Sequence, residues 1–302
     1  MTLQFVFCGG MGCLVQGMSC GKRTERLGSA GGLLICRWVL AMAQFNVDSY
    51  PPSGQRQSSP VGPRLVGGTT FSGKSALDGA QVEVLARACL QGRDASTRVV
   101  VGWQRQGQSL ADIYLCGIAP CARLVGQWWS ADRLDFAMTT IVSAHLQQLL
   151  HDFSAEFLQE SAQPLNGWSV LLLTEPGAQH SMGLFMLGEF FKRDGWALTM
   201  AVPQDMVEFK RLFQSDWFDA VGVSISTDRH LQTLISGLRQ LKDSSLNQGV
   251  QIFVGGPMAL LEPARLKGMP AEVVAMEAPA TVKWMRQRMP LTTLGAGQTL
   301  GM

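Results

Sequence analysis

Residues 171–190 read LLLTEPGAQHSMGLFMLGEF, and this stretch decides the fold. An apolar run of strand length ends at Thr174, a turn containing Gly177 follows, and apolar residues then recur at helical spacing. The turn holds His180, one of four histidines in the chain, and Gly183 follows three residues later. A strand that leads through a short turn into a helix is the unit from which parallel sheets are built.

The same alternation continues to the end of the chain. Short apolar runs at 168–174, 196–202, 219–226, 250–256 and 272–276 are separated or followed by helical patterns at 181–195, 203–216, 228–244 and 278–289. Runs that are apolar on both faces are typical of parallel strands covered by helices on both sides. The sequence therefore predicts a flavodoxin-like (Rossmann-like) five-stranded α/β domain over 164–302, which binds its ligand outside the carboxyl ends of the strands.

Residues 76–163 have a different, helical pattern. Helices are expected at 75–92, with Ser75 as its N-cap, at 109–129, where Pro120 should kink or split the helix, and at 132–159. Only STRVVVGW at 96–103 alternates as a strand would. A helical bundle is the expectation for this part of the chain.

The first 75 residues are expected to lie outside both folded parts. Residues 1–49 are interpreted as a flexible N-terminal extension or as a segment preceding an alternative start at Met42. Residues 50–75 are rich in Pro, Gly and Ser, which is the composition of a linker.

Composition limits the classes of function. A hydrophobic content of 46% over 302 residues supports a sizeable core, and no apolar run reaches the roughly 20 residues that span a bilayer. Seven scattered cysteines without a CxxC pair favour reduced thiols and a cytoplasmic protein. A net charge of +2 and the lack of a basic helix-turn-helix pattern make direct DNA contact the less favoured interpretation.

Polar and small residues follow three strands of the predicted sheet. His180 follows the first strand, Ser224 and Ser226 end the third, and Gly255 and Gly256 end the fourth. Each is common by itself, but the order G-x-x-H-x-x-G, S-x-S and GG brings an imidazole, two hydroxyls and bare backbone to one edge. GxGxxG and GxxxxGK[ST] are both missing, so the edge does not match a nucleotide-binding loop.

This arrangement resembles the cobalamin-binding domain of methionine synthase, mutases and light-responsive regulators, whose signature is D-x-H-x-x-G, then S-x-L or a variant, then GG. The resemblance implies hydroxo- or adenosylcobalamin as the cofactor and His180 as the lower axial ligand of cobalt. It also implies a set of cofactor-binding residues: Trp129, Gly177, Gln179, Gly183, Ser224, Ser226, Gly255 and Gly256.

One residue departs from the signature. The family aspartate that holds the imidazole is Ala178 here, and Glu175 is the hypothesised substitute.

The helical part resembles the four-helix cap that precedes such domains. Ile118, Pro120, Gly126 and Trp129 match its Ile/Leu-x-Pro and Gly-x-x-Trp positions. The resemblance implies that Trp129, or its rival Trp128, covers the upper face of the corrin ring. The Glu-His pair of the light-sensing relatives is replaced by Asp135-Phe136.

A second histidine is the candidate upper ligand. Met138, Ile141, Val142, His145 and Leu149 fall on one apolar, inward stripe of helix 132–159, so His145 is the predicted upper axial ligand. The alternative is a hydrogen-bonded buried histidine. His151 falls on the polar face of the same helix, and His230 is expected at the surface.

Over 76–290 the chain looks similar to antirepressors of photosystem gene expression of the AerR/PpaA type. That similarity implies a light- or redox-responsive regulator, not an enzyme, that binds a DNA-binding transcriptional repressor. Two alternatives remain. One is a corrinoid protein of a methyltransferase system, which should keep the Asp-x-His pair, and the other is a sensor with non-covalently bound haem. The sequence leaves the oligomeric state open.

Overall fold

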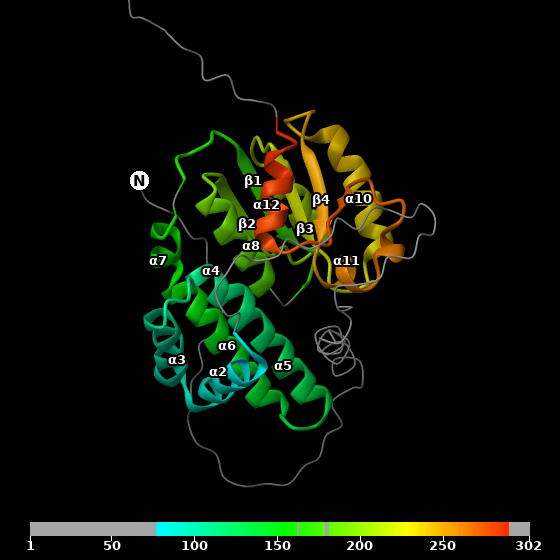
Figure 1. Ribbon diagram of the computed structural model, residues 1–302. Helices are drawn as coiled ribbons and strands as arrows, with labels where there is room; N and C mark the ends of the chain where they lie inside the picture. The colour runs from blue at the N-terminus through cyan, green and yellow to red at the C-terminus, as the bar shows by residue number, and fades with distance from the viewer. Residues whose placement is uncertain (1–76, 162, 179–180, 290–302) are drawn as a thin grey trace, which may run out of the picture.

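The computed structural model describes residues 77–161, 163–178 and 181–289 (Figure 1). These residues form a helical unit followed by an α/β unit. The predicted N-terminal extension (1–49) and linker (50–75) lie outside the described residues. No helix in the described ranges is long and apolar enough to cross a membrane.

The helical unit begins at an N-cap. Asp78 accepts a hydrogen bond from the backbone N–H of Gln81, and the Gln81 side chain accepts one from the N–H of Asp78. Asp78 is therefore the cap, and Ser75 lies outside the described residues. The unit runs, in chain order, through α2 (Gly79–Gln91), α3 (Arg93–Arg105), α4 (Leu110–Asp112), a π-helical segment (Ile113–Ile118), α5 (Ala119–Ser130), α6 (Phe136–Asp152) and α7 (Ser154–Gln159).

The strand-like stretch STRVVVGW is helical and belongs to α3. Ser96, Val100 and Trp103 are buried on one side of this helix, at spacings of four and three residues. Packing of that side against α2 and α6 overrides the strand preference of the β-branched residues.

Pro120 neither splits nor ends its helix. A π-helical segment, Ile113–Ile118, comes just before it, and the N–H of Ala119 bonds to the carbonyl of Tyr114, five residues back. Proline lacks the N–H that would close the next regular turn. The wider π turns accommodate that loss, so α5 continues from the same helix.

The sheet has the predicted parallel topology. Its strands are β1 (Ser169–Thr174), β2 (Ala197–Ala201), β3 (Ala220–Ser224), β4 (Gln251–Gly255) and β5 (Glu272–Val273). Their order is β2-β1-β3-β4-β5, and every neighbouring pair is parallel. This is the flavodoxin-like order, so the predicted fold class is confirmed.

Helices cover both faces of this sheet. The helices that follow the strands are α8 (Met182–Arg193), α9 (Met206–Phe213), α10 (Leu231–Ser244), α11 (Pro257–Leu261) and α12 (Ala278–Arg286), and a 3₁₀ turn covers Pro263–Leu266. One core contains the sheet face under α8 and α12, and a second contains the face under α9 and α10. Neither α11 nor the 3₁₀ turn was expected from the sequence.

The helical unit shares the first of these cores. Phe157 of α7 packs edge-on against Phe190 of α8 at a centroid distance of 5.0 Å, and Tyr114 stacks on Phe157 at 4.7 Å. Figure 1 shows the helical unit and α11, which follows β4, at the same end of the sheet. The bundle therefore stands at the carboxyl end of the strands.

A buried carboxylate also joins the two units. Glu189 of α8 is fully buried, accepts a hydrogen bond from Ser154 of α7, and pairs with Lys192 at 2.9 Å. Nearby, the Arg193 guanidinium lies over the Phe157 ring at 4.6 Å. Polar and aromatic contacts thus fix α7 on α8.

Candidate ligand site at the carboxyl edge

Three strands end in register at the carboxyl edge of the sheet. Thr174 of β1 pairs with Ser224 of β3, and Ser224 pairs with Gly255 of β4. Side chains alternate along a strand, so Thr174 shares its face with Val170 and Leu172, which belong to the core under α8 and α12. Ser224 and Gly255, which the sequence placed at the same edge, therefore lie side by side at the ends of β3 and β4.

The two glycines of the GG pair differ in what requires them. Gly256 has a φ of +89°, and a Cβ there would lie 2.7 Å from Ser224 Oγ and 2.9 Å from the Ile225 backbone nitrogen. A Cβ on Gly255 would have only an ordinary contact, 3.4 Å from the Val274 carbonyl. The backbone conformation and close contacts at position 256 therefore require glycine. Glycine at position 255 is not required in this way, and its missing side chain leaves space at the edge where a ligand could approach.

The loop after β1 starts with a tight turn. Gly177 has a φ of +73° and donates its N–H to the Pro203 carbonyl at 2.9 Å, while Ala178 donates to the Glu175 carbonyl. Gln179 and His180 lie outside the described residues, so His180 stays a predicted lower ligand. Gly183, in the first turn of α8, has no described atom within 4 Å of its Cβ position.

Glu175 is buried and bonded to the neighbouring loop. Its Oε1 accepts hydrogen bonds from the backbone N–H groups of Ser226 and Thr227, both at 3.0 Å. Burial raises the pKa of the Glu175 carboxyl, although these hydrogen bonds oppose the shift. The described bonds of Glu175 therefore tie the β1 loop to the β3 loop, and its proposed support of His180 stays a prediction.

The two tryptophans of α5 have different surroundings. Trp128 is buried, and the guanidinium groups of Arg87 and Arg133 lie 5.7 and 5.0 Å from its ring. Trp129 is only half-buried. Trp128 is thus committed to the helical unit, while Trp129 keeps surface that a ligand could cover.

His145 makes its described contacts inside the helical unit. Its Nδ1 lies 2.7 Å from the Cys89 carbonyl of α2. A carbonyl only accepts, so Nδ1 carries the proton and the lone pair of the neutral ring is on Nε2. No described contact joins His145 to the carboxyl edge, and its role as upper ligand stays a prediction.

The apolar stripe predicted for α6 is only partly inward. Val142 and Leu149 are fully buried, but the exposed fractions of Met138 and Ile141 are 47% and 48%. His151, assigned to the polar face, lies with its ring 4.3 Å from Phe185 of α8. His151, in the last turn of α6, therefore contacts the α/β unit.

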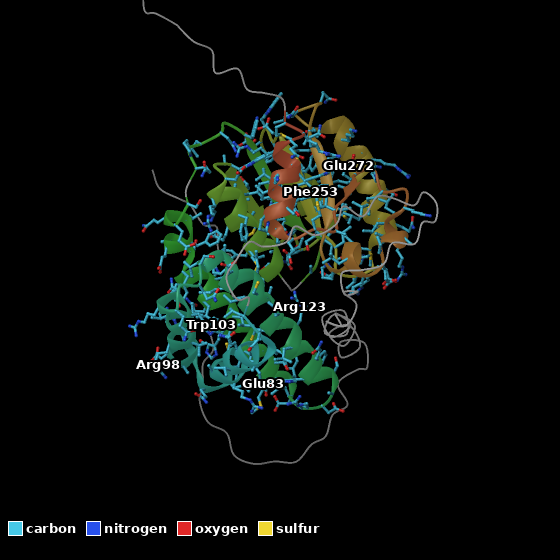
Figure 2. All side chains as sticks on the ribbon, viewed as in Figure 1. Glu83, Arg98, Trp103, Arg123, Phe253 and Glu272 are labelled. Atoms are coloured by element: carbon cyan, nitrogen blue, oxygen red, sulfur yellow. The ribbon has the colours of Figure 1, made fainter. Side chains whose placement is uncertain are left out.

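Sequence reasoning missed three features near the boundary between the helical unit and the α/β unit. Thr174 Oγ1 is buried and has no hydrogen-bond partner. Figure 2 shows Arg123 of α5 near the boundary between the two units. Cys116, in the π-helical segment, has its pKa raised by burial and by the Asp112 and Glu277 carboxylates, of which Glu277 precedes α12. Of these three features, Arg123 could have been noticed in the sequence, because it is the one charged residue in the largely apolar helix α5.

One solved structure has the same architecture. No protein-family model matches the chain. The solved Methanosarcina barkeri monomethylamine corrinoid protein aligns with a TM-score of 0.58 at 13% identity, over 70% of this chain and 100% of that one. The two chains share a fold. A cobalamin-binding protein from Desulfitobacterium hafniense DCB-2 aligns at 14% identity over 69% of this chain and 98% of that one, with a TM-score of 0.36.

One curated relative is similar in sequence. It is described as an uncharacterized 20.5 kDa protein in the bchF-crtJ intergenic region of Rhodobacter capsulatus. The two proteins are 29% identical over 140 residues, which is 46% of this chain and 72% of the relative.

Proposed function

We propose that this protein binds cobalamin between the helical unit and the carboxyl edge of the sheet, and that it is a regulator and not an enzyme. In this proposal it acts as an antirepressor by binding a DNA-binding repressor of photosystem genes. The observation that carries the proposal is the row of Thr174, Ser224 and Gly255, which end three neighbouring strands at one edge of the sheet. The shared fold with a corrinoid protein supports it.

The residues present fit such a cofactor. Gly255 and Gly183 leave room for a bulky group, and Thr174 and Ser224 offer hydroxyls at the same edge. Cobalamin would supply a cobalt ion whose ligation can change with light or redox state. His180 would be the lower ligand, and half-buried Trp129 would exclude water above the ring.

His145 has the tautomer that a metal ligand needs. Ligating histidines usually donate their second nitrogen to a carbonyl or carboxylate, as Nδ1 of His145 does to Cys89. For His145 to serve as the upper ligand, its Nε2 would have to face the cofactor while Nδ1 stays bonded to the Cys89 carbonyl.

The regulatory role draws on the relative in the bchF-crtJ intergenic region. Its location favours a connection with photosystem genes. The near-neutral charge of the chain favours contact with a repressor protein over direct contact with DNA.

The second candidate is a corrinoid protein of a methyltransferase system. The monomethylamine corrinoid protein is covered completely by the alignment, which favours this candidate. Ala178 in place of the family aspartate speaks against it. None of the reported similarities favours haem.

Absorption spectra provide the first test. The purified protein is mixed with hydroxocobalamin and, separately, with haemin, in dark and light. His180→Ala and His145→Ala are compared with His230→Ala, an exposed histidine at the start of α10. A protein-dependent cobalamin spectrum altered by His180→Ala and unchanged by His230→Ala is expected. Binding of haemin alone, or of neither compound, would overturn the cofactor assignment.

The antirepressor role needs a separate assay. A photosystem-gene repressor bound to its DNA is titrated with the cobalamin-loaded protein, and release of the DNA is measured by fluorescence anisotropy. Release is expected with the loaded protein. Unchanged DNA binding, together with methyl transfer from the methylcobalamin-loaded protein to a thiol, would favour the methyltransferase candidate.

A further inference from the structure

β2 is an edge strand whose outward-pointing backbone groups are unpaired among the described residues. The Ala197 N–H donates to the Trp168 carbonyl at 2.8 Å, and in this parallel register every second residue of β2 bonds to β1. The N–H and C=O groups of Leu198 and Met200 therefore point away from the sheet. In the part of the chain that the structure describes, no backbone hydrogen bond reaches them.

β2 lacks the features that usually protect an edge strand. Its sequence, ALTMA, contains no charge and no proline, and its register with β1 runs without a bulge. The strand at the opposite edge is protected, because β5 is only two residues long and begins with Glu272, which lies 3.9 Å from the Arg288 guanidinium. An unprotected edge is therefore a property of β2 and not of the whole sheet.

The side chains of β2 leave its edge accessible. Leu198 and Met200 lie on the α8 face of the sheet, where they pack against the first core. Ala197 and Thr199 alternate to the other face and are exposed. The core thus fixes the backbone of the two residues that point outward, and only small side chains lie exposed beside it.

We propose that β2 pairs with β2 of a second copy of this chain, in an antiparallel arrangement centred on Thr199. Leu198 of each copy then exchanges two hydrogen bonds with Met200 of the other, which uses all the outward backbone groups of both residues. The two Thr199 residues form a non-hydrogen-bonded pair with their Cα atoms about 4.5 Å apart. A two-fold axis closes this interface and joins the two sheets into one.

The charges at the two ends of β2 favour this antiparallel arrangement. Lys192 and Arg193 lie in the last turn of α8, just before β2, and Asp194 after them is paired with an arginine of α12 at 3.0 Å. Asp205 caps α9 and Glu208 lies in its first turn, just after β2. Antiparallel pairing brings the basic end of one copy to the acidic end of the other, whereas parallel pairing would bring like charges together.

The arrangement also separates the two helical units. Each helical unit stands at the carboxyl end of its own strands. Because antiparallel pairing points the two sets of strands in opposite directions, the helical units lie at opposite ends of the joined sheet. The second copy therefore reaches β2 without displacing the helical unit of the first.

The first test measures the mass of the full-length protein by sedimentation equilibrium. Over protomer concentrations of about 1–100 µM, the wild type should show a monomer–dimer equilibrium. Thr199→Lys places like charges opposite each other and should raise the dimer dissociation constant at least about 10-fold. The matched control is Val273→Lys in β5, where the exposed fraction is 39%, and it should leave the constant unchanged. Circular dichroism checks that each variant is folded.

Cysteine cross-linking tests the register. A Cα separation of about 4.5 Å lies within the range of a disulfide, so Thr199→Cys should form a covalent dimer under mild oxidation. Val273→Cys and the wild type, which carry the same seven native cysteines, should show only background cross-linking on a non-reducing gel. Cysteine and threonine are similar in size, so this exposed substitution should preserve the fold.

Every contrary result refutes the pairing. A wild type that is monomeric at about 100 µM has no such interface. A dimer that Thr199→Lys leaves intact forms through another surface, and equal cross-linking of Thr199→Cys and Val273→Cys excludes the register. A monomeric wild type whose binding to the repressor is lost in Thr199→Lys would assign the edge to the repressor instead of a second copy. None of these measurements depends on cobalamin, so failure here leaves the proposed cofactor intact.

Discussion

Replacing Gly256 by alanine should destabilise the protein strongly. The residue has φ +89° and ψ −174°, a backbone region that is nearly restricted to glycine and costs a residue with a Cβ about 1–3 kcal/mol. The new Cβ would also lie 2.7 Å from Ser224 Oγ and 2.9 Å from both the nitrogen and the oxygen of Ile225. Overpacking of this kind costs about 1–3 kcal/mol. The expected loss in the free energy of unfolding is therefore about 2–6 kcal/mol.

Gly255→Ala is the matched control. Its Cβ would make only an ordinary contact, at 3.4 Å from the Val274 carbonyl, so a loss below about 1 kcal/mol is expected. Both variants are unfolded in urea and followed by far-UV circular dichroism, with equal m-values as the condition for comparison. A Gly256→Ala variant within 1 kcal/mol of the wild type, or two equal losses, would refute the reasoning.

Three further predictions concern the carboxyl edge of the sheet and the helical unit that packs against it. Because the folded-state pKa of Glu175 is raised, its contribution to stability is present below the unfolded value of about 4.3 and is lost as pH rises. Glu175→Gln should therefore gain stability relative to the wild type between pH 4 and 7 in urea titrations, and a constant difference would contradict this. A double-mutant cycle of Ser154→Ala and Glu189→Gln should give a coupling energy of about 1.5–3 kcal/mol, and a value near zero would mean that the bond contributes nothing. Trp128→Ala should cost about 3–5 kcal/mol and Trp129→Ala clearly less, and equal losses in urea unfolding would contradict their different burial.

The sheet could be predicted from sequence because its signals are local. Each strand is a short apolar run bounded by turn residues, and all five expected runs contain a strand. The order of the strands also followed, because alternating strands and helices restrict the topology to a few doubly wound arrangements. β5 is shorter than its run, since only Glu272 and Val273 pair with β4.

The helical unit was harder because packing between helices decides its details. The β-branched residues of α3 look like a strand until Ser96, Val100 and Trp103 are seen to face one core. Similarly, an apolar stripe on α6 indicated that His145 points inward, but periodicity does not reveal which neighbouring helix it meets. In the structure His145 meets Cys89 of α2.

The sequence predicted which edge of the sheet holds the candidate site, but it did not predict the contacts within that site. The positions of Ser224 and Gly255 follow from strand ends, which sequence shows well. The unpartnered hydroxyl of Thr174 and the binding of Glu175 to the β3 loop depend on three-dimensional contacts between loops. No pattern in the sequence distinguishes Thr174 from any other threonine at the end of a strand.

The core shared by the helical unit and the α8 face of the sheet has a consequence for signalling. The helical unit packs on α8 through Phe157 against Phe190 and through the hydrogen bond of Ser154 to Glu189, so it cannot move freely relative to the sheet. Moving it means opening part of the main core, which is a step towards partial unfolding. A ligand that triggers such a movement must bind the opened arrangement more tightly by at least the free energy of that opening. The free energy needed to separate the helical unit from α8 therefore sets a lower limit on the difference in ligand affinity between the two arrangements.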